Sequence, residues 1–249
     1  MIESKVPETW IELQNEVNRI FVECRFESET PKIIETVRGK VEVDIVAVDT
    51  SLKPTTVYLC ECKHWKSAIP QTVIHGFRTV VSDFGANWGF IISLNGYQSG
   101  SYEAIKNTNI KLLDWFEFQN IFEERWYKEY FQQQLSGIGE PLIEYTEPIN
   151  SGLFRRVDLL NLSAQKEFKN LRGKYRDIAF FALILYVPSN SNKLIKLPLK
   201  SEQNKELRER YILPSELLEA TTYREVLRIV LKYIKKGLDE FDNIFGYRV

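Results

Sequence analysis

The chain is 249 residues long, with 44% hydrophobic and 27% charged side chains and a net charge of −1 at pH 7. It has few Gly or Pro residues, no low-complexity tract and three cysteines, which argues against a repetitive, disordered or disulfide-stapled protein. The N-terminal residues carry too many charges for a secretion signal, and the longest apolar run, Ile178–Val187, is too short for a membrane span. We therefore expect a cytoplasmic protein with no membrane partner.

A helix at 9–24 is the first expected element, because apolar side chains recur there at three- and four-residue spacing. The segments that read as strands are 32–37, 41–48, 56–62, 88–93 and 111–114. Further helices are expected at 69–84, 102–107 and 115–134. This order of elements predicts an α/β domain with a mixed central sheet flanked by helices.

A segment containing Gly and Pro at 137–152 is predicted as a linker, which sets the first domain at 1–136 and a second at 153–249. The second domain is predicted to be mainly helical. One helix begins near Ser163, and Thr222 opens the last with a capping box.

Charge is distributed unevenly along the chain. Residues 1–150 carry 14 basic and 22 acidic side chains, whereas residues 151–249 carry 19 basic and 12 acidic ones. The C-terminal part is therefore the better candidate for contact with a polyanion, although attraction between the two halves explains the pattern as well. The basic side chains considered for such a face are Arg155, Arg156, Lys166, Lys169, Arg172, Lys174 and Arg176.

The expected strand at 41–48 carries one carboxylate among apolar neighbours. Side chains alternate along a strand, so Val43 and Ile45 are expected on one face and Asp44 on the other, with Val46. A carboxylate in such a strand is costly unless it is paired or binds a metal. Asp44 is therefore a candidate site residue.

The next expected strand repeats this pattern. Glu61 and Lys63 are expected on one face with Leu59, and Cys60 and Cys62 on the other. Neighbouring strands would then bring an Asp, a Glu and a Lys together. Two carboxylates form a hard-oxygen site suited to Mg²⁺, which can polarise a phosphodiester and activate a water molecule. The lysine can orient that water or stabilise the negative charge that develops on phosphorus.

These residues resemble the PD-(D/E)XK nuclease superfamily, most closely its Mrr-like restriction endonuclease branch. The resemblance lies in Arg38-Gly-Lys-Val-Glu-Val-Asp44-Ile-Val-Ala, in Leu59-Cys-Glu61-Cys-Lys63-His-Trp and in the order of the elements over residues 9–125. It implies a restriction-endonuclease-like core. Two positions depart from the family pattern: Val43 replaces the Pro of the superfamily name, and Glu61 stands where many Mrr-like proteins have Gln.

By this resemblance Asp44 and Glu61 are metal ligands and Lys63 is the catalytic lysine. Glu16 on the first helix is implied as a further acidic ligand, with Glu12 as its substitute, and Gln71 as a side chain that contacts the site. The family implies Mg²⁺, or Mn²⁺ in its place, DNA as substrate, and a restriction or other anti-phage role. A homodimer and a partner ATPase or sensor subunit are further expectations.

Other interpretations remain open. Asp44 and Glu61 could form a buried ion network with Arg38 and Lys63, and Cys60, Cys62 and His64 could be packing residues or, less readily, zinc ligands. The substrate could be RNA or branched DNA, because the phosphodiester chemistry is shared. The domain could also be a non-catalytic nuclease fold that works as an assembly subunit.

Overall fold

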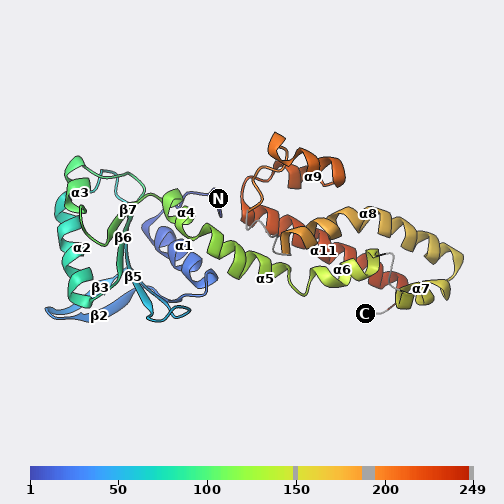
Figure 1. Cartoon of the computed structure of the whole chain (residues 1–249), viewed down its shortest axis with the longest axis horizontal. Coiled ribbons are helices and arrows are strands. Elements are labelled where there is room, and N and C mark those ends of the chain that lie inside the picture. Colours follow the sequence, from blue (N-terminus) through green and yellow to red (C-terminus); the bar gives the residue numbers. More distant parts are fainter. Residues whose placement is uncertain (148–150, 187–193, 247–249) are drawn as a thin grey trace. The chain divides into compact units, whose positions relative to one another are not determined.

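The computed structural model describes residues 1–147, 151–186 and 194–246, and the chain divides into two units (Figure 1). The N-terminal unit is Lys5–Glu129. The helical unit consists of Tyr130–Val249 together with the first four residues, Met1–Ser4.

The N-terminal unit is built on a five-stranded sheet with the strand order β1-β4-β5-β6-β7. These strands are β1 Glu27–Glu29, β4 Ile45–Asp49, β5 Thr56–Lys63, β6 Trp88–Ser93 and β7 Ile110–Leu113. β4 is antiparallel to both β1 and β5, while β6 is parallel to both β5 and β7. The predicted α/β fold with a mixed central sheet is therefore confirmed.

A second sheet pairs β2 Lys32–Thr36 with β3 Gly39–Val43 in an antiparallel hairpin. The continuous strand expected at 41–48 is wrong: the chain bends at Asp44, so that β3 joins the small sheet and β4 the large one. The bend also interrupts side-chain alternation. Val43 therefore lies in the same cluster as Val46 rather than on the face of Ile45.

Helices cover both faces of the large sheet (Figure 1). α1 Trp10–Glu23 and α4 Trp115–Trp126 cover one face, and α2 Gln71–Phe84 covers the other, followed by the short α3 Ser99–Ala104. α2 is capped by Gly85, whose φ of 76° is the left-handed conformation that favours glycine at this position.

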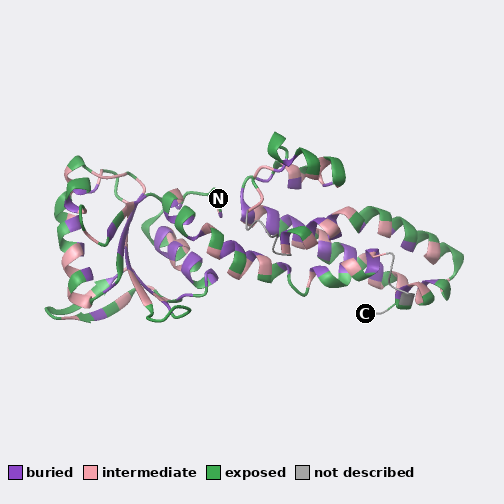
Figure 2. Cartoon of the chain, viewed as in Figure 1, coloured by how far each residue is buried: buried purple, intermediate pink, exposed green. Residues whose placement is uncertain are grey.

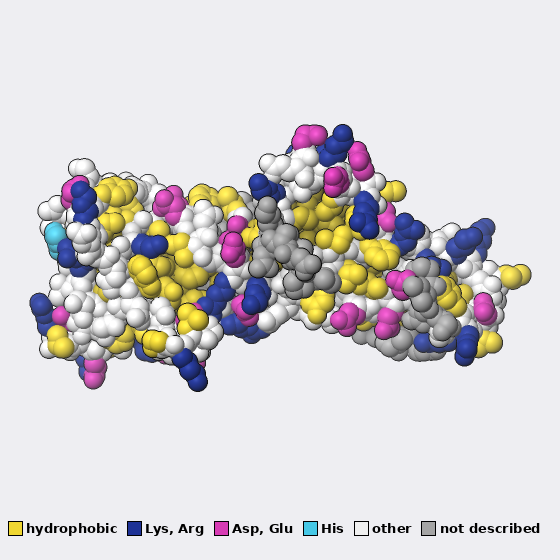
Figure 3. Space-filling model, in the orientation of Figure 1, with side chains coloured by type: hydrophobic (Ala, Val, Ile, Leu, Met, Phe, Trp, Pro, Cys, Tyr) yellow, Lys and Arg dark blue, Asp and Glu magenta, His cyan; other side chains and the backbone are white. Residues whose placement is uncertain are grey.

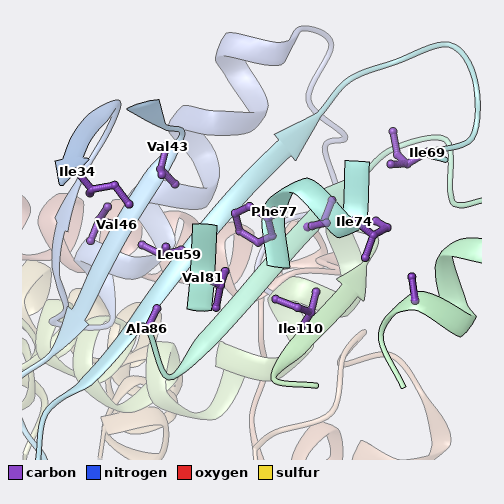
Figure 4. Packing of buried hydrophobic residues seen from close by; sticks show 12 residues of the cluster. Ile34, Val43, Val46, Leu59, Ile69, Ile74, Phe77, Val81, Ala86 and Ile110 are labelled. Carbon is purple, nitrogen blue, oxygen red and sulfur yellow. The ribbon is translucent and has the colours of Figure 1, made fainter. Parts of the chain in front are cut away.

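Buried residues lie on both faces of the sheet (Figure 2), and the two cores differ in composition. On the α2 face the buried residues are mostly aliphatic, with Phe77 and Val81 of α2 lying over Leu59 and Val46 (Figure 4). On the α1 face the core is aromatic, and its rings are in contact with one another: Phe21, Phe26, Tyr58, Phe90, Phe118 and Phe122.

Some expected elements differ in extent. The short helix expected at 102–107 lies three residues earlier, at Ser99–Ala104. The long helix expected at 115–134 is interrupted by a π-helical turn at Tyr127–Phe131 before α5 Gln132–Leu135. The strand β1 was not expected, because Glu27-Ser-Glu29 has no apolar side chain to indicate one.

The helical unit contains α6 Gly139–Thr146, α7 Ser151–Asp158, α8 Leu162–Tyr186, α9 Lys205–Arg210, α10 Ser215–Glu219 and α11 Tyr223–Phe245. Its core lies where α6, α8 and α11 meet. The rings of Tyr145 and Phe241 stack there, with their centroids 4.6 Å apart. α11 begins with the predicted capping box of Thr222 and Glu225. The predicted mainly helical character of this part of the chain is confirmed.

The segment 137–152 was expected to be a linker, but it contains α6, whose Leu142 and Tyr145 are buried in the helical unit. Residues 148–150 of the segment lie outside the described residues. Among the described residues, no helix has both the length and the apolar character needed to cross a bilayer.

Candidate active site

Asp44 lies at the bend between β3 and β4, where the ladder between β4 and β5 stops. The last paired residues of that ladder are Ile45 and Cys60. Beyond this pair the Cys62 N–H has no backbone partner on the β4 side, and it donates a hydrogen bond of 2.7 Å to Asp44 Oδ2. The break in the strand therefore directs the Asp44 carboxylate across β5.

Glu61 and Lys63 follow on β5 and share the face that bears Leu59, as the alternation predicts. The Lys63 ammonium donates to Glu61 Oε1, and the two side chains are 17% and 22% exposed. Glu61 also borders a small cavity of about 170 Å³, lined by Glu42 and by apolar side chains of β3 and α2, among them Val43 and Phe77. The ion pair is thus partly buried beside mostly apolar side chains.

The environment opposes a negative charge on both carboxylates. Burial raises the pKa of Asp44 above its ordinary value, while the Cys62 N–H and the charge of Lys63 act in the opposite direction. Burial also raises the pKa of Glu61, and the nearby charge of Asp44 adds to this, while Lys63 lowers it. Two carboxylates that repel each other in a partly buried place are stabilised by an added cation.

α1 holds the bend from the other side. The Gln14 amide donates a 2.9 Å hydrogen bond to the Asp44 carbonyl, and Gln14 is only 5% exposed. One turn earlier on α1, the side chain of Trp10 lies close enough to the Asp44 carboxylate to lower the pKa of Asp44. Sequence analysis did not select Gln14. The sequence feature that could have indicated Gln14 is its position: it is a polar residue one helical turn after Trp10, beside the buried apolar residues of α1.

Glu16 lies elsewhere on α1. Its carboxylate pairs with Arg19 at 3.4 Å, and it lies about 200° round the helix from Gln14. Glu12 is bound by Lys5 at 2.8 Å. Among the described residues there is no group of three or more acidic, His or Cys side chains suited to a metal. The structure therefore brings Asp44, Glu61 and Lys63 together and leaves Glu16 beside Arg19.

Gln71 is the first residue of α2, and its carboxamide lies against the backbone of Gly100 in α3. Among the described residues, no hydrogen bond joins Gln71 to Glu61 or Lys63. Its predicted role in contacting the site stays a prediction.

The cysteines lie away from this face. Cys60 and Cys62 are buried on the opposite side of β5, and burial raises the pKa of both thiols well above the ordinary value. A thiolate is disfavoured there, so packing explains both residues better than zinc binding. The proposed network of Arg38 with the two carboxylates is wrong, because Arg38 pairs with Asp83 at 2.9 Å.

The basic side chains of α7 and α8 are partly engaged within the helical unit. Lys174 pairs with Glu240 at 2.6 Å, and Arg176 with Asp177 at 3.4 Å. The Arg172 guanidinium lies over the ring of Phe154. Lys166 and Lys169 are exposed.

A known protein family matches most of the N-terminal unit. Residues 9–122 match the family model Mrr_cat, described as "Restriction endonuclease". Among solved structures, the chain is similar to a "Protein of Unknown Function AF1548", at 13% identity and a TM-score of 0.37 over 94% of this chain and 97% of the other. No curated protein matches the chain.

The segment 9–122 is therefore a restriction endonuclease domain of the PD-(D/E)XK nuclease family, as the sequence resemblance predicted. The domain match covers neither of the segments that make up the helical unit, Met1–Ser4 and Tyr130–Val249.

Proposed function

We propose that the N-terminal unit hydrolyses DNA phosphodiester bonds in a reaction that needs Mg²⁺, with Mn²⁺ as a substitute. The observation that carries this proposal is the convergence of Asp44, Glu61 and Lys63 at the end of the β4–β5 ladder, within the matched domain. The sequence resemblance assigns the family motif to these three residues.

The residues present fit a magnesium ion. Asp44 and Glu61 offer hard oxygen donors, and their raised pKa values reflect a place where negative charge lacks compensation. Mg²⁺ usually takes one or two carboxylates and fills its other positions with water and substrate phosphate, so a third acidic ligand such as Glu16 is not required. When bound there, the ion polarises the phosphate and lowers the pKa of a water ligand.

The protein's own groups supply position and charge. Lys63 places an ammonium next to Glu61, where it can orient the attacking water or stabilise charge on the phosphoryl oxygens. Gln14 and Cys62 fix the backbone and carboxylate of Asp44 by direct hydrogen bonds. Such supporting contacts typically change metal affinity or activity by about 10- to 100-fold.

A role in restriction or another anti-phage system is part of the proposal, and the match to a restriction endonuclease domain supports it. We also propose that the helical unit either forms a homodimer or contacts nucleic acid or a partner ATPase or sensor. The exposed Lys166 and Lys169 of α8 support nucleic-acid contact.

The test is a cleavage panel of supercoiled DNA, linear duplex, branched DNA and RNA in Mg²⁺, compared with EDTA. Wild type is expected to cut DNA only with metal, and Asp44→Asn and Glu61→Gln to be inactive while still folded. If wild type cleaved RNA in preference to DNA, RNA would replace DNA as the proposed substrate. If wild type cuts no nucleic acid and binds no Mn²⁺ by calorimetry, the catalytic proposal fails and the assembly-subunit interpretation replaces it.

A further inference from the structure

A large aromatic side chain is exposed beside the catalytic lysine. Trp65 lies two residues after Lys63 and is 43% exposed, and the Lys63 ammonium lies over its ring at 5.7 Å from the centroid. In the described part of the chain, Trp65 makes no contact with another aromatic ring. An indole that is not part of an aromatic cluster is therefore available next to the reacting groups.

The segment that carries Trp65 is braced by a neighbouring loop. The Asn95 amide donates to the Trp65 carbonyl, and the Asn95 N–H itself donates a 3.3 Å hydrogen bond to Ser93 Oγ. Gly96 turns the chain after Asn95 with a φ of 70°, a conformation that favours glycine. The Trp65 backbone is thus tied to the end of β6, which limits the entropy lost when a ligand contacts the ring.

We propose that Trp65 stacks on an unpaired base next to the scissile phosphate, so that this site prefers a DNA strand with unstacked bases to an intact duplex. The inference rests on the proposed nuclease function. Every base has a flat π-face that can stack on an aromatic side chain, but in duplex DNA the neighbouring base pairs cover those faces. A strand end, a flap or a single-stranded gap exposes them.

The charge of the N-terminal unit supports this choice of substrate. Residues Lys5–Glu129 carry 14 basic and 18 acidic side chains, and Figure 3 shows Lys and Arg scattered over the face in view rather than gathered in one patch. Contact with the duplex phosphate backbone draws its affinity from clustered cations. The unit has more acidic than basic side chains, so base stacking supplies a source of binding that does not depend on its net charge.

Trp88 provides a matched control. Trp88 is 37% exposed, and the ammonium of Lys111 lies 5.5 Å from the centroid of its ring. Trp88 is the first residue of β6, whereas the residue of β6 that pairs with Lys63 is the last one, Ser93. Like Trp65, it is a tryptophan that is partly exposed and lies beside a lysine ammonium, but it lies at the opposite end of β6 from the candidate site. Only Trp65 is next to Lys63.

The experiment measures the affinity of the full-length chain for a fluorescent single-stranded oligonucleotide and for the matching blunt duplex, in EDTA so that no strand is cut. Trp65→Ala should weaken binding to the single strand by about 5- to 150-fold and duplex binding by less than about twofold. Trp65→Phe should retain part of the affinity, and Trp88→Ala should behave like wild type. An oligonucleotide of abasic residues, which keeps the phosphates, should bind wild type as weakly as the normal strand binds Trp65→Ala.

Equal losses on single strand and duplex, or equal losses for Trp65→Ala and Trp88→Ala, would overturn the stacking proposal. The two proposals fail separately. If Asp44-dependent cleavage is observed but Trp65→Ala does not change strand preference, stacking is wrong and the nuclease stands. If Trp65 discriminates single strands in EDTA but no nucleic acid is cut in Mg²⁺, the catalytic proposal is wrong instead.

Discussion

Replacing Asp49 by Asn should destabilise the N-terminal unit through the loss of one buried ion pair. Asp49 is the last residue of β4, the strand that begins directly after Asp44, and its side chain is 3% exposed. Both of its carboxylate oxygens accept hydrogen bonds from the Arg125 guanidinium. The Nε of Arg125 also donates a 2.7 Å hydrogen bond to the Cys24 carbonyl. The pair therefore ties β4 to α4 and to the end of α1.

The size of the effect follows from the Asp49 pKa. The hydrogen bonds from Arg125, supported by those from Ser51, lower that pKa from 3.8 to about 2 against the opposing effect of burial. This difference corresponds to about 2.5 kcal/mol of stability at pH 7. Because the folded-state pKa is below the unfolded one, the contribution is complete above about pH 5, falls to about half near pH 3 and vanishes below about pH 2.

The assay is urea denaturation followed by tryptophan fluorescence. All five tryptophans, from Trp10 to Trp126, lie in the N-terminal unit, so the signal reports on that unit alone. Asp49→Asn should lower the midpoint by about 1 M urea at pH 7 and by about half as much at pH 3. Glu103→Gln, which removes an exposed pair with Lys106, should change the free energy of unfolding by less than about 0.5 kcal/mol.

A difference between wild type and Asp49→Asn that stays constant from pH 7 to pH 3 would refute the reasoning. It would mean that the ionisation of Asp49 is not the source of the stability. A variant as stable as wild type at pH 7 would refute it more completely, since removal of one partner of a buried pair leaves the other charge uncompensated.

The remaining predictions concern the positioning of Asp44, the packing of glycines in the N-terminal unit and the capping of α11. Gln14→Leu removes the hydrogen bond to the Asp44 carbonyl, so it should lower the rate of DNA cleavage by about 10- to 100-fold while circular dichroism shows an unchanged fold. Cleavage by this variant at the wild-type rate would contradict the prediction. Gly89→Ala should destabilise the N-terminal unit by about 1–3 kcal/mol, because a Cβ there would meet Ile110 at 2.5 Å and Val81 at 2.6 Å. Gly76→Ala on α2, where a Cβ meets open space, should instead stabilise it by up to about 1 kcal/mol, and the opposite order of the two variants in urea would refute the packing argument. Thr222→Ala should lower helical-unit stability by about 0.5–2 kcal/mol, followed by helical circular dichroism; no change would mean that the capping box does not limit α11.

Local patterns in the sequence were sufficient to select three residues that the structure places close together in the candidate site. Glu61 and Lys63 are two residues apart on one strand, so alternation alone places them on one face. Asp44 stood out as a carboxylate within an apolar strand, and the antiparallel pairing of β4 with β5 brings it to the same end of the sheet. The final helix was also predictable, because its capping box is contained within four residues.

The features that sequence analysis missed depend on contacts between distant segments. The bend at Asp44 arises because β3 pairs with β2 while β4 pairs with β5, and the residues of the segment alone do not indicate these partners. Gln14 became a site residue only through a hydrogen bond across 30 positions of sequence. The strand β1 forms because β4 offers it a paired edge, although its own side chains do not indicate a strand.

The most direct test of the account is single-turnover cleavage of supercoiled plasmid in Mg²⁺ by wild type and by Lys63→Met. Tryptophan fluorescence would first show that both proteins have a folded N-terminal unit. We predict a metal-dependent cut by wild type and a rate at least about 100-fold lower for Lys63→Met, because the ammonium beside Glu61 is lost. Cleavage by Lys63→Met at the wild-type rate would contradict the assignment of this site.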